Sequence, residues 1–171
     1  MTVVTSPRTR PEVTPGRLQH VFDFDLHGLP SEKPNISARD REGEFIVNSA
    51  GTVTGENIRG KIRMTFFAKN CAYLLVKAGI EPARGQHLCK ENDAGVIETD
   101  DGAKILFDTK GYGLRGADPA NPKKWRLAMT VQFSTKDERY QWLNTSFGFW
   151  EGQFDEEAGR ASYQAYIHRY D

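Results

Sequence analysis

The sequence has little of several features that would define a class of function. Its two cysteines, Cys71 and Cys89, are too few and too far apart for a zinc motif or a disulfide framework. We therefore expect reduced thiols and a cytoplasmic protein. No segment approaches the roughly 20 apolar residues that span a bilayer. Lysine plus arginine (23) equals aspartate plus glutamate (23), and this balance argues against the basic surface of a nucleic-acid binder. We expect neither a membrane nor a nucleic acid as partner.

Motifs for cofactors and for covalent catalysis are also missing. None of the four histidines stands in a His-x-His or His-Glu-x-x-His spacing, which predicts no metal. There is no Gly-x-Ser-x-Gly elbow, and neither cysteine is flanked by an activating partner. The glycines of GYGLRG (111–116) lead into a proline-rich loop and not into a helix, so they indicate a bend or bulge and not a phosphate cradle. We expect no cofactor.

The sequence has 171 residues, which is the length of one domain with a hydrophobic core. Residues 1–17 are rich in Pro, Thr and Arg and lack a continuous apolar stretch. They predict a flexible arm and not a signal peptide, which leaves 18–171 as the folded domain.

Apolar residues recur with a period of two through most of 18–171. They occupy the even positions of 18–26, positions 58, 62, 64 and 66, and the odd positions of 125–133. This alternation predicts antiparallel strands with one buried face. Turn signals at 55–57, 99–104, 117–124 and 155–159 punctuate the strands about every ten residues. The pattern predicts an all-β fold, a meandering antiparallel barrel or a sandwich.

Three segments depart from this alternation. Residues 66–88 carry a roughly helical stripe and predict a short helix or a capping loop over one end of the barrel, and the polar segment 30–43 predicts an exposed loop. DERYQWLN (137–144) predicts a corner between strands, with one helical turn that Asn144 ends and with Trp142 and Leu143 pointing inward.

Three motifs in order carry a family resemblance: GTVTGENIRGKI (51–62), IETDDGAKILFDTKGYGLRG (97–116) and DERYQWLN (137–144). Together they resemble the family known as domain of unknown function 3237. The resemblance implies a single antiparallel β-barrel with a lipocalin-like cavity over 18–171, and it implies no reaction. The family's Pro-Gly-Gly-Ala-Asp-Trp-like loop is replaced here by TFFAKNCAYLLVKAG, which predicts a rebuilt barrel mouth.

A closed barrel of about eight strands can hold one small molecule, so the interior is the expected site. If Ile97 points inward, the period of two also points Asp93 and Glu91 inward. Two carboxylates on one strand face repel each other, which raises at least one pKa and suits a general acid or base. The alternative is that 88–93 is a loop with solvated carboxylates. His20, on the apolar face of the first strand, is a third catalytic candidate if it faces this pair, and otherwise a core or rim residue.

Further residues are candidates for binding a substrate. Tyr112 and Arg115 would orient an anionic or carbonyl group at the mouth, or serve as ordinary surface residues. Trp142 would form a wall and Asn144 donate an amide hydrogen, or the two would only pack and tie the corner. The apolar lining would include Phe22 and Met129.

These residues predict a cofactor-independent enzyme of the isomerase, lyase or cyclase type, which moves protons on a small apolar or aromatic oxygenated molecule. The alternative is a non-catalytic protein that binds such a ligand. A third prediction is a homodimer, formed through exposed aromatic residues such as Trp150 and Tyr166.

Overall fold

The computed structural model describes residues 16–29, 35–39, 42–70, 79, 88–115 and 120–169. Its elements are almost all strands, joined by one short 3-10 helix, η1. They are β1 (Arg17–Gly28), β2 (Asn35–Arg39), β3 (Glu42–Thr54), β4 (Gly60–Lys69), β5 (Leu88–Thr99), β6 (Lys104–Arg115), β7 (Lys124–Ser134), η1 (Glu138–Thr145), β8 (Phe147–Asp155) and β9 (Arg160–Arg169).

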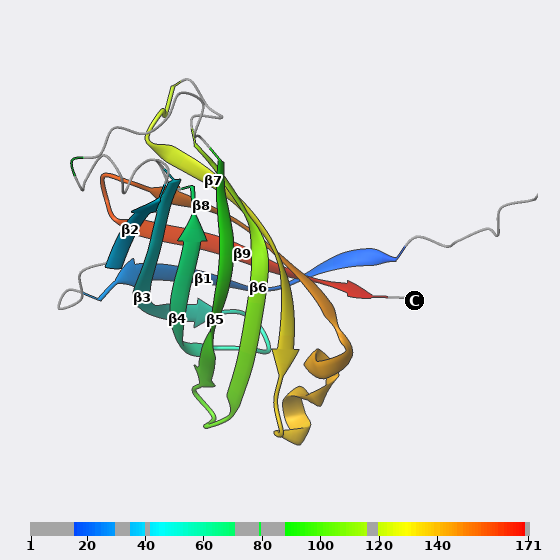
Figure 1. Ribbon diagram of the computed structural model, residues 1–171. Coiled ribbons are helices and arrows are strands. Elements are labelled where there is room, and N and C mark those ends of the chain that lie inside the picture. Colours follow the sequence, from blue (N-terminus) through cyan, green and yellow to red (C-terminus); the bar gives the residue numbers. More distant parts are fainter. Residues whose placement is uncertain are drawn as a thin grey trace, which may run out of the picture.

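The strands close into an antiparallel β-barrel (Figure 1). From β3 to β9 each strand pairs with the next along the chain, and β1 pairs with both β9 and β3, which closes the ring at eight strands. The long strand β3 pairs with β4 along one edge and with two strands along the other edge. Along this second edge its first residues pair with β2 and its last residues with β1. The prediction of an all-β antiparallel meander barrel is confirmed.

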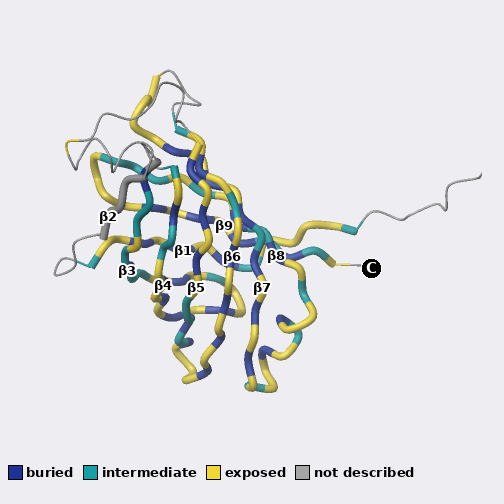
Figure 2. The backbone as a smooth tube through the Cα atoms, in the orientation of Figure 1, coloured by how far each residue is buried: buried dark blue, intermediate teal, exposed yellow. Residues whose placement is uncertain are grey.

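Buried and exposed residues alternate along the strands of the barrel (Figure 2). On β7, for example, Trp125, Leu127 and Met129 are buried and the residues between them are mostly exposed. The predicted buried faces are confirmed for β4 and β7 and for the second half of β1. The apolar interior drives closure of the barrel, because each buried large side chain stabilises the fold by roughly 1.5–3 kcal/mol.

One end of the barrel is plugged by residues from three connections. Ile58 comes from the β3–β4 turn, Ala103 from the β5–β6 hairpin, and Leu143 from η1, and all three belong to the buried core. The Asp101 carboxylate accepts hydrogen bonds from Arg139 Nη1 (2.7 Å) and Tyr140 Oη (2.9 Å), which ties the hairpin to η1. We call this the closed end; it lies at the bottom of Figure 1.

The corner predicted at 137–144 is confirmed as η1. Asp137 caps its start by accepting the N–H of Arg139, and Leu143 is fully buried. The Asn144 side chain accepts the Thr135 N–H (2.8 Å) and donates to the Thr135 carbonyl (3.0 Å). Asn144 therefore fastens the end of the turn to its beginning, which is the structural role expected for it.

Other expectations are corrected or fall outside the described residues. Residues 35–39 are strand β2 and not a loop, and 66–69 belong to β4. The expected helix or cap over 71–87 and the N-terminal arm up to residue 15 lie outside the described residues, apart from Gly79. No helix in the described part of the chain is long and apolar enough to cross a membrane.

The expectation of reduced thiols is wrong for Cys89, which is disulfide-bonded. The sequence argument dismissed a disulfide because two cysteines cannot make a framework, but a single bridge needs no framework. Since disulfides are rare in reducing compartments, the argument for a cytoplasmic protein loses its basis.

Candidate active site in the barrel interior

Strand β5 carries two acidic side chains into the barrel. It runs regularly from Leu88 to Thr99, and its burial pattern alternates, so Glu91, Asp93 and Ile97 share the inward face. Glu91 is 9% exposed and Asp93 only 2%. The inward placement is confirmed and the alternative of a solvated loop is wrong. Their catalytic role stays a prediction.

Asp93 is held by the barrel wall on both of its oxygens. Oδ1 accepts the backbone N–H of Phe67 (3.3 Å), and Oδ2 accepts the hydroxyl of Thr109 (3.3 Å) on the neighbouring strand β6. The β4–β5 ladder pairs Thr65 with Ala94 and Ala68 with Glu91, and it is interrupted between these pairs. The Asp93 carboxylate therefore takes the place of a backbone acceptor for β4.

Glu91 lies against a part of the wall where β6 has a glycine. A Cβ built on Gly113 would come within 2.9 Å of Glu91 Oε1 and 3.0 Å of Leu127 Cδ2, so the missing side chain leaves the space that the carboxyl occupies. Glu91 Oε2 is buried and has no hydrogen-bond partner among the described residues. Both oxygens of Asp93 are thus bound by the fold, whereas Glu91 Oε2 is not bonded to any described residue.

Burial perturbs both carboxyl groups strongly. Loss of hydration, followed by repulsion from Asp93, raises the pKa of Glu91 to about 8. Burial also raises the pKa of Asp93 to about 7, although the hydrogen bonds from Phe67 and Thr109 act in the opposite direction. Near neutral pH the pair therefore holds both protonated and ionised carboxyl groups, which is the requirement for an acid and a base acting together.

An aromatic cluster faces these carboxyl groups across the interior. The Phe24 ring stacks on Tyr163, with 4.6 Å between centroids and 10° between planes. Trp150 makes T-shaped contacts with Phe24 and with Phe107, with centroids 4.5 Å and 4.9 Å apart. The negative charges of Glu91 and Asp93 contribute to the raised pKa of Tyr163, after burial itself, which brings the phenol and the acids into one cluster.

Sequence reasoning missed Trp150 and Tyr163 as site residues. The expectation of an exposed Trp150 is wrong, because the side chain is fully buried. On β8 the buried phase consists of Gly148 and Trp150, with a half-buried Gly152 after them, while the outward phase contains Phe147 and Phe149. Hydropathy therefore pointed to the wrong face. The signal for the correct face was the pair of glycines that flank Trp150, since small inward residues make room for large neighbours in a narrow barrel.

The prediction that His20 shares the inner face with Phe22 is wrong. A β-bulge at Val21 shifts the pairing between His20↔Tyr166 and Phe22↔Ala165. One extra residue reverses which side chains point inward, so His20 is exposed and its ring nitrogen lies 2.8 Å from Asp23 Oδ1. It does not face Glu91 or Asp93.

Tyr112 and Arg115 do not contact the carboxyl pair either. Tyr112 falls on the outward phase of β6 and is 55% exposed. Arg115 pairs with Glu156 through both Nε (2.5 Å) and Nη2 (3.1 Å), and the same carboxylate accepts the Trp125 indole N–H (2.7 Å). Arg115 thereby ties the end of β6 to the β8–β9 turn.

The remaining candidates divide between the interior and the closed end. Met129 is buried, and its backbone pairs with Gly111, which on its other side pairs with Glu91. Phe22 is buried next to Phe24. Trp142 is partly buried against the core, and Arg169 Cζ lies 5.5 Å from the centroid of its ring.

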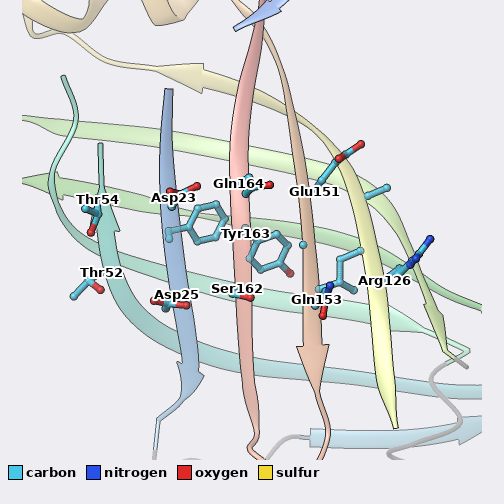
Figure 3. Close-up of a pocket in the computed structure, with 14 residues that line it drawn as sticks. Asp23, Asp25, Thr52, Thr54, Arg126, Glu151, Gln153, Ser162, Tyr163 and Gln164 are labelled. Atoms are coloured by element: carbon cyan, nitrogen blue, oxygen red, sulfur yellow. The ribbon is translucent and has the colours of Figure 1, made fainter. Parts of the chain in front are cut away.

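Two grooves open on the outer surface. One, of about 650 Å³, crosses β3, β1, β9, β8 and β7. Its lining is mainly polar and outward, with Asp23, Asp25, Glu151 and Arg126 among its residues, and it also includes the inward residues Phe24, Leu127 and Tyr163 (Figure 3). The other, of about 370 Å³, lies at the closed end and includes Trp142. Carboxylates on these open surfaces remain hydrated, so the buried pair is the stronger candidate for a functional site.

The described residues contain no cluster of three or more His, Cys, Asp and Glu side chains that would hold a metal ion. The prediction that the protein uses no metal and no cofactor stays a prediction.

The fold and the interior define a small closed β-barrel with a buried pair of carboxylic acids. The chain belongs to the family described as protein of unknown function DUF3237, whose model matches residues 16–168. The resemblance inferred from the three motifs is therefore confirmed. A search of curated protein sequences found no significant match.

Solved structures with the same fold include a β-barrel-like protein from Acinetobacter baumannii AYE, at 22% identity and a TM-score of 0.73, over 94% of this chain and 100% of that one. A conserved protein of unknown function from Rhodopseudomonas palustris matches at 18% identity and a TM-score of 0.68, over 92% and 100%. An enzyme from Penicillium herquei matches at 19% identity and a TM-score of 0.62, over 94% and 100%. At these identities the likeness concerns the fold.

Proposed function

We propose that the chain is a cofactor-independent enzyme that moves protons on a small, largely apolar oxygenated molecule inside the barrel. One observation carries the proposal: Glu91 is buried beside a second carboxyl group and keeps an oxygen with no partner among the described residues. The fold relative from Penicillium herquei, described as an enzyme, supports the idea that this barrel can host catalysis.

In the proposed reaction Glu91, in its ionised form, removes a proton from carbon or oxygen of the substrate. The electron pair of the broken bond forms a new bond within the substrate, and the Glu91 carboxyl group, now protonated, returns the proton to another substrate atom. Depending on where that proton goes, the net result is an isomerisation, an elimination or a ring closure. No electrons leave the substrate, so no redox cofactor is required.

Glu91 is the group that we expect to exchange protons with the substrate. Asp93 already accepts bonds from the Phe67 N–H and the Thr109 hydroxyl, so it sets the charge and position of its neighbour. A substrate would not enter through the closed end, where Ile58, Ala103 and Leu143 are part of the buried core.

A binding protein without catalysis is the alternative function. It would need the apolar walls but not the two buried acids, which cost stability at neutral and alkaline pH. The energetic cost of the acids therefore favours the enzyme.

Proton exchange tests the proposal without knowledge of the natural substrate. The probe is 2-tetralone, an aryl-fused ketone with an acidic C–H bond, followed in D₂O by NMR for deuterium incorporation. We expect the native protein to accelerate exchange and Glu91→Gln to lose about 100-fold or more. Glu98→Gln, which removes an acid on the same strand that pairs with Arg63, is the matched control. Equal exchange rates for native protein and Glu91→Gln would contradict the assignment.

A further inference from the structure

The interior contains an unusual concentration of unsatisfied polar atoms. Among the described residues, four buried side-chain atoms have no hydrogen-bond partner, and three of them belong to the carboxyl and aromatic cluster: Glu91 Oε2, Trp150 Nε1 and Tyr163 Oη. The fourth is Asn70 Oδ1, at the end of β4. A buried polar group without a partner destabilises the folded state. Three such groups in one interior indicate a place that a ligand completes.

The hydrogen-bonding chemistry of Trp150 and Tyr163 indicates which polar group a ligand must carry. An indole N–H can only donate, and a tyrosine hydroxyl without a partner is also a ready donor. Both groups therefore call for an acceptor oxygen on the ligand. Trp150 and Tyr163 lie on neighbouring strands, with ring centroids 6.2 Å apart, so one ligand can reach both.

The residues around these two donors indicate the shape and charge of the rest of the ligand. Phe24 and Phe107 both make T-shaped contacts with the Trp150 ring, and Phe24 stacks on the Tyr163 ring. Rings in such contacts offer flat apolar faces, which suit a flat conjugated ring. Every charged side chain of the described interior core is an acid, Glu91 or Asp93, so a ligand carboxylate or phosphate would be repelled.

We propose that Trp150 and Tyr163 bind the acceptor oxygen of a neutral aromatic ligand, a phenol or an aryl ketone, and that the interior rejects aromatic anions of the same size. This inference rests on the proposed function for the identity of the site and adds the class of substrate. The nearby acids also favour the neutral form of a bound phenol, as they do for Tyr163 itself, whose pKa is raised.

Spectroscopic titration with two matched probes tests the proposal. 4-Nitrophenol absorbs at different wavelengths in its neutral and ionised forms, and 4-nitrobenzoate supplies the same ring with a fixed negative charge. We expect 4-nitrophenol to bind the native protein in its neutral form and at least tenfold more tightly than 4-nitrobenzoate. Absence of 4-nitrophenol binding, binding as the phenolate, or equal binding of the two probes would overturn the proposal.

Variants locate the binding. Tyr163→Phe keeps the ring that stacks on Phe24 and removes only the hydroxyl, and we expect it to weaken 4-nitrophenol binding about tenfold. Tyr166→Phe is the control, because that hydroxyl bonds to Gln164 outside the interior; its Kd should stay within twofold of native. Trp150→Phe, folded as judged by circular dichroism, should weaken binding to a similar extent. Equal Kd values for Tyr163→Phe and Tyr166→Phe would refute the role of Tyr163.

The Glu91→Gln variant separates this proposal from the proposed function. Glutamine keeps the shape of the side chain, so 4-nitrophenol binding should stay within threefold of native while proton exchange on 2-tetralone is lost. Exchange by the native protein without 4-nitrophenol binding would refute the ligand class alone. Tyr163-dependent binding together with undiminished exchange in Glu91→Gln would refute the catalytic assignment alone.

Discussion

Replacing Glu91 by glutamine should remove about half of a large pH dependence of folding stability, and the remainder should come from Asp93, whose pKa burial also raises. The carboxyl group has an ordinary pKa of 4.5, and in the folded protein burial and Asp93 raise the pKa to about 8. Between these two values the folded state binds the proton and the unfolded state does not. The free energy of unfolding therefore falls as the pH rises through this window, and it levels off above about pH 8.

The magnitude follows from the difference between the two pKa values. At about 1.36 kcal/mol for each pKa unit, a rise from 4.5 to about 8 corresponds to a loss of about 4 to 5 kcal/mol. This is a large part of the roughly 5–15 kcal/mol that stabilises a typical domain. Glutamine is uncharged at every pH, so the variant should match the native protein within about 1 kcal/mol near pH 5. Above about pH 8 it should be the more stable of the two by about 3 to 5 kcal/mol.

Urea unfolding, followed by tryptophan fluorescence from about pH 5 to about pH 9, measures this difference directly. Glu98→Gln serves as the control, since that carboxylate pairs with Arg63 at the surface and its removal should leave the pH profile close to native. Parallel pH profiles for the native protein and Glu91→Gln would refute the reasoning, because they would mean that Glu91 titrates alike in the folded and unfolded states.

Two further substitutions test how the wall and the corner are built. Asn144→Ala removes both hydrogen bonds to the Thr135 backbone, and urea unfolding should show a loss of about 1–3 kcal/mol, against little change for Asn92→Ala on the exposed face of β5. Gly113→Ala would place a methyl group 2.9 Å from Glu91 Oε1 and should cost about 1–3 kcal/mol. That cost should shrink when Glu91 is also changed to Ala, and an equal cost in both backgrounds would mean that Glu91 does not fill the space beside Gly113.

Periodicity was sufficient to predict the architecture, because one buried face and one wetted face leave a direct trace in each strand. It also placed Glu91 and Asp93 correctly, since β5 runs without a bulge from Ile97 back to Glu91. The same reasoning failed for His20, where the bulge at Val21 reverses the phase. A bulge depends on how two strands pair, and the sequence of one strand carries only a weak sign of it, here the apolar Val21 on the polar face.

The donors Trp150 and Tyr163 were beyond the reach of periodicity for a different reason. Strand β8 has aromatic residues on both faces, with Phe147 46% exposed and Trp150 fully buried. Which face points inward is decided by its partners: Trp150 pairs with Met129 and Ala165, both of which are buried. Only the assembled ring of strands reveals that these aromatic residues share the interior with the acids from β5.

The two acids contribute differently to the fold, and this difference is the strongest reason to propose Glu91 as the group that exchanges protons with a substrate. Asp93 replaces a backbone acceptor where the β4–β5 ladder is interrupted, so a structural role accounts for its burial. Glu91 has no comparable role, since one of its oxygens has no partner in the described interior. Its burial lowers stability at neutral pH, and nothing in the described wall offsets that cost. A group that costs stability and fills no structural need is best explained by chemistry on a ligand. A Glu91→Gln variant that gains stability at alkaline pH but loses proton exchange would show that Glu91 lowers stability and supports the reaction in the same protein.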